Sequence, residues 1–419
     1  MARGVRAQPP VDAGSKADPR VWGSGSGRVW HVGQVRVAAA GLPDGVVHAG
    51  SREFLVREGL PASGAFLDFG AIGDGALEAL PGSERWFVLG ETEYCAPFAA
   101  AGGPVLLDGV TGEVFLGEEG TADGEVRRDP LASGLPALAG LVREVEEVAA
   151  AARRADALDG RRGPAVVAEV TAGAERRMRE ADPELFGRAA APAHWGTALL
   201  VRALGWGALP GGPGGPAFEV GAELVADLAA LTDQDDGAGA VHRFRAEELP
   251  AGLVHEPTRR LLTEIGLPLG GAMFGVGAEP LVTMAEAYPE YFDGEEERPY
   301  QREFLALGDW PTDLTIALDG VTGRLELPDW YDDGEPEAYL NRDLSALLYA
   351  LWTCERLRAE WDRWDYGRGR DTWAVFDPQS LLSTVVDRLV EAVDPEAFAS
   401  PGRSWRLLAE DAHLGGLLG

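Results

Sequence analysis

Residues 106–116 read LLDGVTGEVFL, and residues 317–327 read ALDGVTGRLEL. Both stretches hold the pentapeptide Asp-Gly-Val-Thr-Gly between two apolar runs. Glycine tolerates the positive φ angles that tight turns require, so each stretch predicts a β-hairpin. The same hairpin at two places in one chain indicates that a larger unit is repeated.

The similarity extends on both sides of the hairpin. Residues 34–61 (QVRVAAAGLPDGVVHAGSREFLVREGLP) align without a gap to residues 241–268 (VHRFRAEELPAGLVHEPTRRLLTEIGLP). Further along, RWFVLGE at 85–91 matches EFLALGD at 303–309, and DPELF at 182–186 matches DPEAF at 394–398. The blocks keep their order, so the chain contains a duplicated domain of roughly 170 residues.

The repeat predicts four regions. They are a disordered N-terminal tail (1–30), a first domain (31–205), a Gly/Pro-rich linker (206–238) and a second domain (239–419). In each copy a short helix, with Ser51 or Thr258 as its N-cap, is followed by short apolar strands, the hairpin and a long amphipathic helix (135–155 or 344–364). This order predicts an α+β fold, with a small, mostly antiparallel sheet flanked by helices in each copy.

The charge of the chain limits its partners. There are 37 Lys and Arg residues against 68 Asp and Glu residues, which gives a net charge of −31. This balance disfavours nucleic acid as a ligand and suits either a basic protein partner or simple solubility. The N-terminus lacks the apolar core of a secretory signal, and no apolar run is long enough to span a membrane. We therefore expect a cytoplasmic protein.

No pattern of residues predicts catalysis, a cofactor or a metal site. Cys95 and Cys354 and the six histidines are scattered, without metal-ligand spacing, and no P-loop or nucleophile elbow is present. His48 and His255 occupy equivalent positions in the two copies. They are either functional histidines or structural ones that hold the turn before the first helix. The absence of a shared acid or nucleophile favours the structural interpretation, and the sequence does not decide their role.

Two segments of the second copy are candidates for binding a partner. Residues 291–301 (YFDGEEERPYQ) belong to the largest insertion relative to the first copy, and residues 329–339 (DWYDDGEPEAY) mix acids with aromatic rings. Such mixtures occur at protein interfaces and also in solvated loops. The predicted partner-binding residues are Asp293, Glu295, Glu296, Glu297, Trp330, Tyr331, Asp332, Asp333, Glu335 and Tyr339.

The repeated elements together resemble a known family. EFLVREGLP, LLTEIGLP, LDGVTG and YLNRDLSALLYAL (339–351) are similar to the SUKH superfamily, and most closely to its fourth immunity subfamily, which is common in actinobacteria. The second copy resembles the family more closely, because the first has RRDPLASGLPAL (127–138) in place of the segment containing Asn341.

The resemblance implies a function. Members of this family are α+β domains without catalytic residues that bind and neutralise polymorphic toxins, often nucleases or deaminases. It therefore implies a non-enzymatic immunity protein whose partner is a toxin domain with a basic surface. The alternatives are a scaffold or regulatory protein-binding module with the same fold, and an enzyme, which would require a catalytic cluster repeated in both copies.

Overall fold

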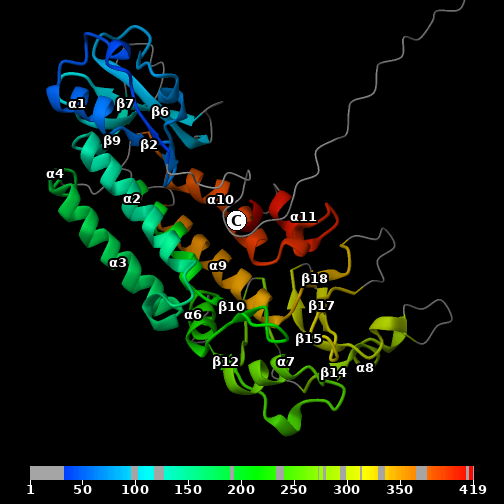
Figure 1. Cartoon of the computed structure of the whole chain (residues 1–419). Helices are drawn as coiled ribbons and strands as arrows, with labels where there is room; N and C mark the ends of the chain where they lie inside the picture. Colours follow the sequence, from blue (N-terminus) through cyan, green and yellow to red (C-terminus); the bar gives the residue numbers. More distant parts are fainter. Residues whose placement is uncertain are drawn as a thin grey trace, which may run out of the picture.

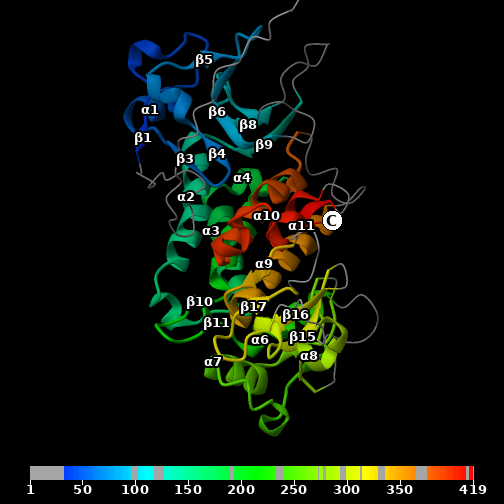
Figure 2. The same cartoon turned by 90° about the vertical axis from the view of Figure 1, so that its right-hand side faces the viewer.

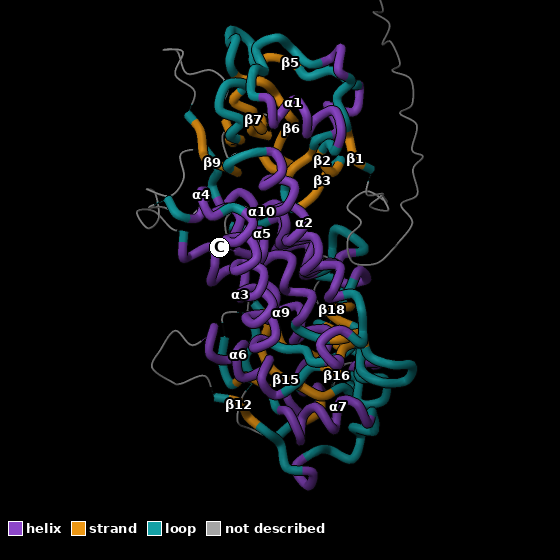
Figure 3. Tube along the Cα trace, turned by 60° about the vertical axis from the view of Figure 1, so that its left-hand side comes forward, coloured by secondary structure: helices purple, strands orange, loops and turns teal. Residues whose placement is uncertain are grey.

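The computed structural model describes residues 33–95, 102–117, 127–188, 193–232, 240–271, 273–276, 280–292, 299–311, 314–328, 336–364, 375–411 and 415–418. The tail predicted at residues 1–30 lies outside these ranges. Two main sheets lie at opposite ends of the molecule, with helices from both halves of the chain between them (Figure 1). Figure 2 and Figure 3 show the same order from two other sides. The predicted α+β class is confirmed.

The first sheet is formed by the first copy. Its strands lie in the order β3-β4-β6-β7-β8-β9, β5 also pairs with β6, and every pair is antiparallel. The strands are β3 (Ser63–Gly64), β4 (Leu67–Asp68), β5 (Glu78–Ala79), β6 (Trp86–Cys95), β7 (Gly102–Asp108), β8 (Val114–Gly117) and β9 (Arg128–Ala132). Because side chains alternate along a strand, Phe87 and Leu89 enter the main core, whereas Trp86 and Val88 lie on the outer face.

The second sheet repeats the central strands of the first. It has the order β14-β15-β16-β17-β18 and is also antiparallel throughout. The strands are β14 (Val282–Thr283), β15 (Leu305–Trp310), β16 (Leu314–Leu318), β17 (Leu325–Glu326) and β18 (Tyr339–Asn341). A β-bulge interrupts the last pair of both sheets, between β8 and β9 and between β17 and β18. The predicted hairpins are β7–β8 and β16–β17.

Each copy begins with a short pair of strands around a helix. In the first copy β1 (Gln34–Val35) pairs with β2 (Leu60–Pro61), and in the second β12 (Val241–His242) pairs with β13 (Leu267–Pro268). The helices between them are α1 (Ala49–Arg57) and α7 (Glu256–Arg260), and α7 continues as a π-helical turn over Leu261–Ile265. Gly59 and Gly266 follow these helices with φ angles of 78° and 92°, which only glycine adopts easily.

Longer helices from both copies form most of the layer between the two sheets. The first copy contributes α2 (Leu135–Ala152), α3 (Pro164–Ala181), α4 (Pro183–Phe186) and α5 (Ala193–Ala203), and the second contributes α9 (Leu344–Arg363), α10 (Pro378–Val393) and α11 (Ser404–Glu410). A buried aspartate joins sheet to helices in each copy. Asp182 accepts a hydrogen bond of 2.7 Å from the N–H of Ser133, and Asp394 accepts one of 2.7 Å from that of Arg342. The two Asp-Pro-Glu blocks therefore have the same structural role.

The segment predicted as a linker, residues 206–238, is folded over most of its length. It contains β10 (Leu209–Pro210), β11 (Phe218–Glu219) and α6 (Ala222–Thr232). Leu224, Val225 and Leu228 of α6 are buried, and α6 packs against α9. The Gly/Pro cluster forms only the turn between β10 and β11. Residues 209–232 therefore do not act as a simple linker, because apolar side chains of α6 pack against α9 of the second copy.

The two copies share one apolar core. Phe376, which lies just before α10, packs against the rings of Phe66 and His194 in the first copy, at centroid distances of 5.2 and 5.3 Å. Asp129 of β9 accepts hydrogen bonds from the N–H groups of Val375 and Phe376, at 2.8 and 2.7 Å. Beyond this point α10 packs on α5. A helix of the second copy therefore completes the core of the first.

Candidate partner-binding surfaces

The repeated pentapeptide forms the same turn in both copies. The carboxylate of Asp108 accepts a hydrogen bond from the N–H of Val110 at 2.9 Å, and that of Asp319 accepts one from Val321 at 2.8 Å. The last glycine of each pentapeptide has a φ angle near +80°, at 82° and 81°. The aspartate and the glycine therefore hold the turn, which is ordinary turn chemistry.

His48 and His255 pack directly on these turns. They are the N-cap residues of α1 and α7, and their Nδ1 atoms lie 2.9 Å from Ser51 Oγ and 2.8 Å from Thr258 Oγ1. A Cβ atom on Gly112 would lie 2.2 Å from His48 Nδ1, and the second copy shows the same distance. The prediction of Ser51 and Thr258 as N-caps is wrong, because the histidine three residues earlier takes that position.

These contacts also bear on the functional interpretation of the two histidines. In many hydrolases a histidine acts as the base that activates a neighbouring serine or threonine hydroxyl as the nucleophile. Here Ser51 and Thr258 are both only 2% exposed, and each packs inside its own helix start. Substrate could not reach either hydroxyl in this arrangement, so the geometry favours the structural interpretation of His48 and His255.

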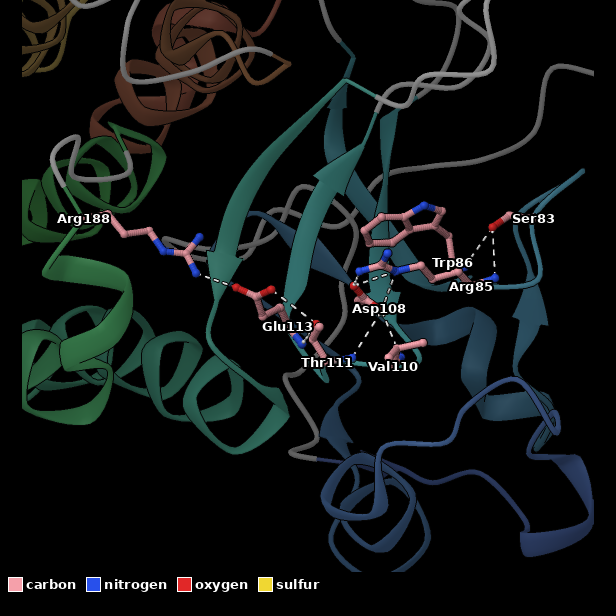
Figure 4. A network of polar contacts seen from close by, with 8 residues as sticks. All are labelled: Ser83, Arg85, Trp86, Asp108, Val110, Thr111, Glu113 and Arg188. Carbon is pink, nitrogen blue, oxygen red and sulfur yellow. Dashed lines mark hydrogen bonds and ion pairs between the residues drawn. The ribbon is translucent and has the colours of Figure 1, made fainter.

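A polar network extends from the turn of the first copy (Figure 4). Arg85 donates from Nε to both carboxylate oxygens of Asp108 at 3.0 Å, and from Nη2 to one of them at 2.5 Å. Burial acts to raise the pKa of Asp108, but the Arg85 guanidinium and the turn amides together lower it. Glu113 accepts hydrogen bonds from Thr111 Oγ1 at 3.3 Å and from Arg188 at 2.6 Å. The network leaves the side chain of Arg85 54% exposed.

A partly exposed tryptophan stands beside this network on the outer face of the first sheet. The ring of Trp86 meets that of Phe115 edge-on at 5.6 Å, and the guanidinium carbons of Arg85 and Arg128 lie 5.3 and 5.1 Å from its centroid. Leu106 pairs with Phe115 across the strands and is fully buried. We call these five residues the first outer face. The large side chains of the first outer face pack on one another, and the guanidinium groups of Arg85 and Arg128 lie over the indole of Trp86.

The second sheet has different chemistry at the equivalent positions. Arg85, Trp86, Leu106, Phe115 and Arg128 correspond, through the repeat and the strand register, to Glu303, Phe304, Ala317, Glu326 and Glu337. We call these five the second outer face. The small Ala317 packs with Met284 of α8 (Met284–Ala287) and with Phe292 in a separate apolar cluster. The centre of the second outer face, at Ala317, is therefore covered by a segment of its own chain.

Most of the predicted partner-binding residues cannot be placed. Asp293, Glu295, Glu296, Glu297, Trp330, Tyr331, Asp332, Asp333 and Glu335 lie outside the described residues. Tyr339 begins β18 and is partly buried. Its hydroxyl donates to Asp394 at 3.2 Å, and Arg403 lies 4.9 Å from its ring centroid. Burial and the Asp394 carboxylate raise the pKa of Tyr339. Tyr339 thus anchors the end of the segment, and binding by the other nine residues stays a prediction.

The other described residues offer little reactive chemistry. Within those ranges no group of three His, Cys, Asp or Glu side chains could hold a metal ion, and no helix is long and apolar enough to cross a membrane. Cys354 is buried, which raises its pKa to about 12 and leaves the thiol unreactive at neutral pH. A cavity of about 270 Å³ lies between the loop that precedes α3 and the start of α6, lined by Arg162, Glu219, Glu223 and several glycines. Arg162 is occupied there by backbone carbonyls such as that of Ala152.

The sequence alone did not reveal the first outer face. One signal was present, because the aligned repeats place Arg85-Trp86 opposite Glu303-Phe304. This reversal of charge lies within a block that otherwise shows the similarity of the copies. Strand register is needed to see that Phe115 and Arg128 join the same surface, because side-chain direction alternates along each strand.

Comparison with known families agrees with the duplication. The family model described as SUKH-4 immunity protein matches the chain twice, at residues 19–202 and 228–411. Searches of curated proteins and of solved structures gave no match. The family implies a role in toxin immunity and a protein partner such as a toxin, and immunity proteins are generally not enzymes. Since the two matches cover most of the sequence, this chain belongs to the SUKH-4 immunity protein family and carries two tandem copies of its domain.

Proposed function

We propose that the chain neutralises one cognate polymorphic toxin by binding it stoichiometrically and without catalysis. Membership of both copies in the immunity family is the observation that carries this proposal. We infer further that the toxin acts on nucleic acid, as a nuclease or a deaminase, and that the two proteins meet in the cytoplasm of the producing cell.

The charge of the chain supports a basic toxin surface. An enzyme that binds nucleic acid needs a positive face to neutralise phosphates. A chain with a net charge of −31 is attracted to such a face, which raises the rate of association and disfavours other partners. An inhibitor bound there excludes the substrate, so inhibition requires no chemistry from the inhibitor.

We place the two binding units at residues 31–205 and 239–419, with the main contacts in the second copy. The acidic run from Asp293 to Glu297 directly follows Phe292, which is 3% exposed in the cluster with Met284 and Ala317. The aromatic and acidic residues from Trp330 to Glu335 precede Tyr339, which is anchored on Asp394. Both candidate segments therefore adjoin fixed points of the fold.

The proposal is tested by finding the partner and then assaying it. The tagged chain is used to capture proteins from its native host, and each captured candidate is expressed alone in a heterologous host. The expected result is a protein that stops growth alone, is harmless when the chain is co-expressed, and forms a one-to-one complex with it by light scattering. Captured proteins that are harmless alone would instead support a scaffold or regulatory module.

The acidic run is tested with the same toxin. Glu295→Gln, Glu296→Gln and Glu297→Gln combined should slow association and weaken protection. A matched control changes three glutamates outside the candidate segments, Glu53→Gln, Glu147→Gln and Glu169→Gln, and lowers the negative charge by the same amount. Equal loss in both triple variants would show that only net charge matters and would remove the run from the binding site.

A further inference from the structure

The first outer face has no role in the function proposed above. We propose that it is a separate docking surface, for a protein segment that presents a carboxylate next to an apolar side chain. This inference goes beyond the proposed function, since that function uses acidic residues of the second copy. It also does not depend on whether the docked partner is the toxin.

Arg128 is the residue that points to a carboxylate. It is exposed, and its contacts are with two aromatic rings, Trp86 at 5.1 Å and Phe115 at 5.2 Å. In the described part of the chain no carboxylate pairs with Arg128. Its guanidinium donors are therefore available to a partner, and their fork matches the two oxygens of a carboxylate.

Charge complementarity supports the same conclusion. Acidic side chains outnumber basic ones by 68 to 37 in this chain, so an exposed arginine has many potential partners. Other exposed arginines do pair with them, as Arg57 does with Glu53 and Arg154 with Glu147. Arg128 instead keeps its charge on an aromatic surface next to Arg85. A partner that brings its own carboxylate supplies an ion pair that the described part of the chain does not.

The rest of the first outer face is ordered in advance. Arg85 is fixed by its hydrogen bonds to the buried Asp108, and the backbone N–H of Trp86 donates to Ser83 Oγ at 3.0 Å. Phe115 supports the indole edge-on. A partner therefore meets a rigid surface, and little conformational entropy is lost on binding. Tryptophan and arginine are also the residues that most often dominate protein interfaces.

A protein segment fits this face better than nucleic acid does. Phosphates would also pair with arginine, but a net charge of −31 repels a polyanion at long range. A segment with a few carboxylates is repelled less. Its apolar side chains can pack on Trp86, next to the pair formed with Arg128.

The experiment uses fluorescence anisotropy with the full chain and a short labelled peptide in which glutamates alternate with leucines. Ionic strength is physiological, so that charges beyond about 8 Å are screened. We expect the peptide to bind, and Arg128→Glu to weaken binding by about tenfold or more. Arg57→Glu, the matched control, changes the charge equally on α1 and should leave the affinity within about twofold. The same peptide with glutamine in place of glutamate should bind at least about tenfold more weakly.

Four results would overturn the proposal: no binding of the acidic peptide, equal binding of the glutamate and glutamine peptides, equal losses in the two arginine variants, or tighter binding of a single-stranded oligonucleotide than of the acidic peptide. Thermal unfolding verifies that each variant is folded, and Arg128→Gln replaces Arg128→Glu if the latter is not. The toxin assay is read separately. A negative toxin assay does not contradict the docking proposal, and a peptide that does not bind does not contradict the toxin proposal.

Discussion

The first and second outer faces occupy the same place in two copies of one fold, but different parts of the chain bury their central residues. In the first copy Leu106 and Phe115 fill the face, and Trp86 reaches the surface between cations. In the second copy Ala317 is small, and Met284 of α8 covers it. The comparison teaches that the duplicated copies kept their cores and turns while this face diverged. α8 covers the second face at Ala317, whereas the first face is the one that we propose as a docking surface.

The largest effect on stability is expected when Leu106 of the first outer face is replaced by alanine, the residue found at the equivalent position of the second outer face. Leu106→Ala should lower the free energy of unfolding of the first sheet by about 3 kcal/mol, because among the described residues of the first copy no segment equivalent to α8 fills the cavity. Amide hydrogen exchange measures this locally in β6 to β8, and β15 and β16 are the internal control. A loss under about 1 kcal/mol would show that Leu106 does not close this face.

The reverse substitution should cost less. Ala317→Leu places the larger residue of the first copy under α8, where it meets Met284 and Phe292. Overpacking of this kind should cost about 2 kcal/mol, because α8 must shift or detach. Hydrogen exchange of α8 is the measurement, and exchange of the first sheet should not change. If the hydrogen-exchange protection of α8 does not change, the small size of Ala317 is not needed for α8 to pack on the sheet.

The parts of the fold that the sequence predicted are those with local signals. The hairpins follow from turn residues between apolar runs, and the helices predicted at 135–155 and 344–364 are present as α2 and α9. The equivalence of His48 and His255 also followed from the aligned repeats. In each case the pattern and the structure it forms lie within one short window of sequence.

The parts that it did not predict depend on long-range contacts. The Gly/Pro-rich segment was expected to be a linker, but Leu224 and Leu228 of α6 pack on α9, more than a hundred residues away in sequence. Nothing in the sequence of α10 indicates that it packs on α5 of the first copy. The first outer face was missed for the same reason, since Trp86 and Arg128 meet only through the strand register.

A second comparison concerns the residue before the buried tryptophan of α5 or α11, which is His194 in the first copy and Ser404 in the second. Ser404 Oγ accepts a hydrogen bond from Trp310 Nε1 at 2.6 Å. His194 is fully buried, and neither of its ring nitrogens has a hydrogen-bond partner in the described part of the chain. Burial lowers the pKa of His194 to about 3. The shared core therefore contains a titratable group at a place where the second copy has none.

Acid should therefore weaken the first copy selectively. The unfolded chain binds a proton at this histidine below its ordinary pKa of about 6.5, whereas the folded chain does so only near pH 3. The free energy of unfolding should fall by about 1.4 kcal/mol per pH unit between these values. Between pH 7 and 5 the wild type should lose about 2 kcal/mol more than His194→Phe. Equal pH profiles of the two proteins in urea denaturation would contradict this.

The smallest effect is expected at Arg128, compared with Arg403 of the second copy. Both guanidiniums lie over an aromatic ring, but Arg403 is 15% exposed and also pairs with Glu337 at 3.3 Å and Glu396 at 2.8 Å. Arg403→Ala should cost about 2 kcal/mol, because it leaves these partners without their cation. Within the described part of the chain Arg128→Ala removes cation–π contacts and no ion pair, so it should cost less than about 1 kcal/mol in denaturant unfolding. Equal losses of unfolding free energy in the two variants would mean that Arg128 stabilises the fold. Its guanidinium would then not be available to a partner at the first outer face.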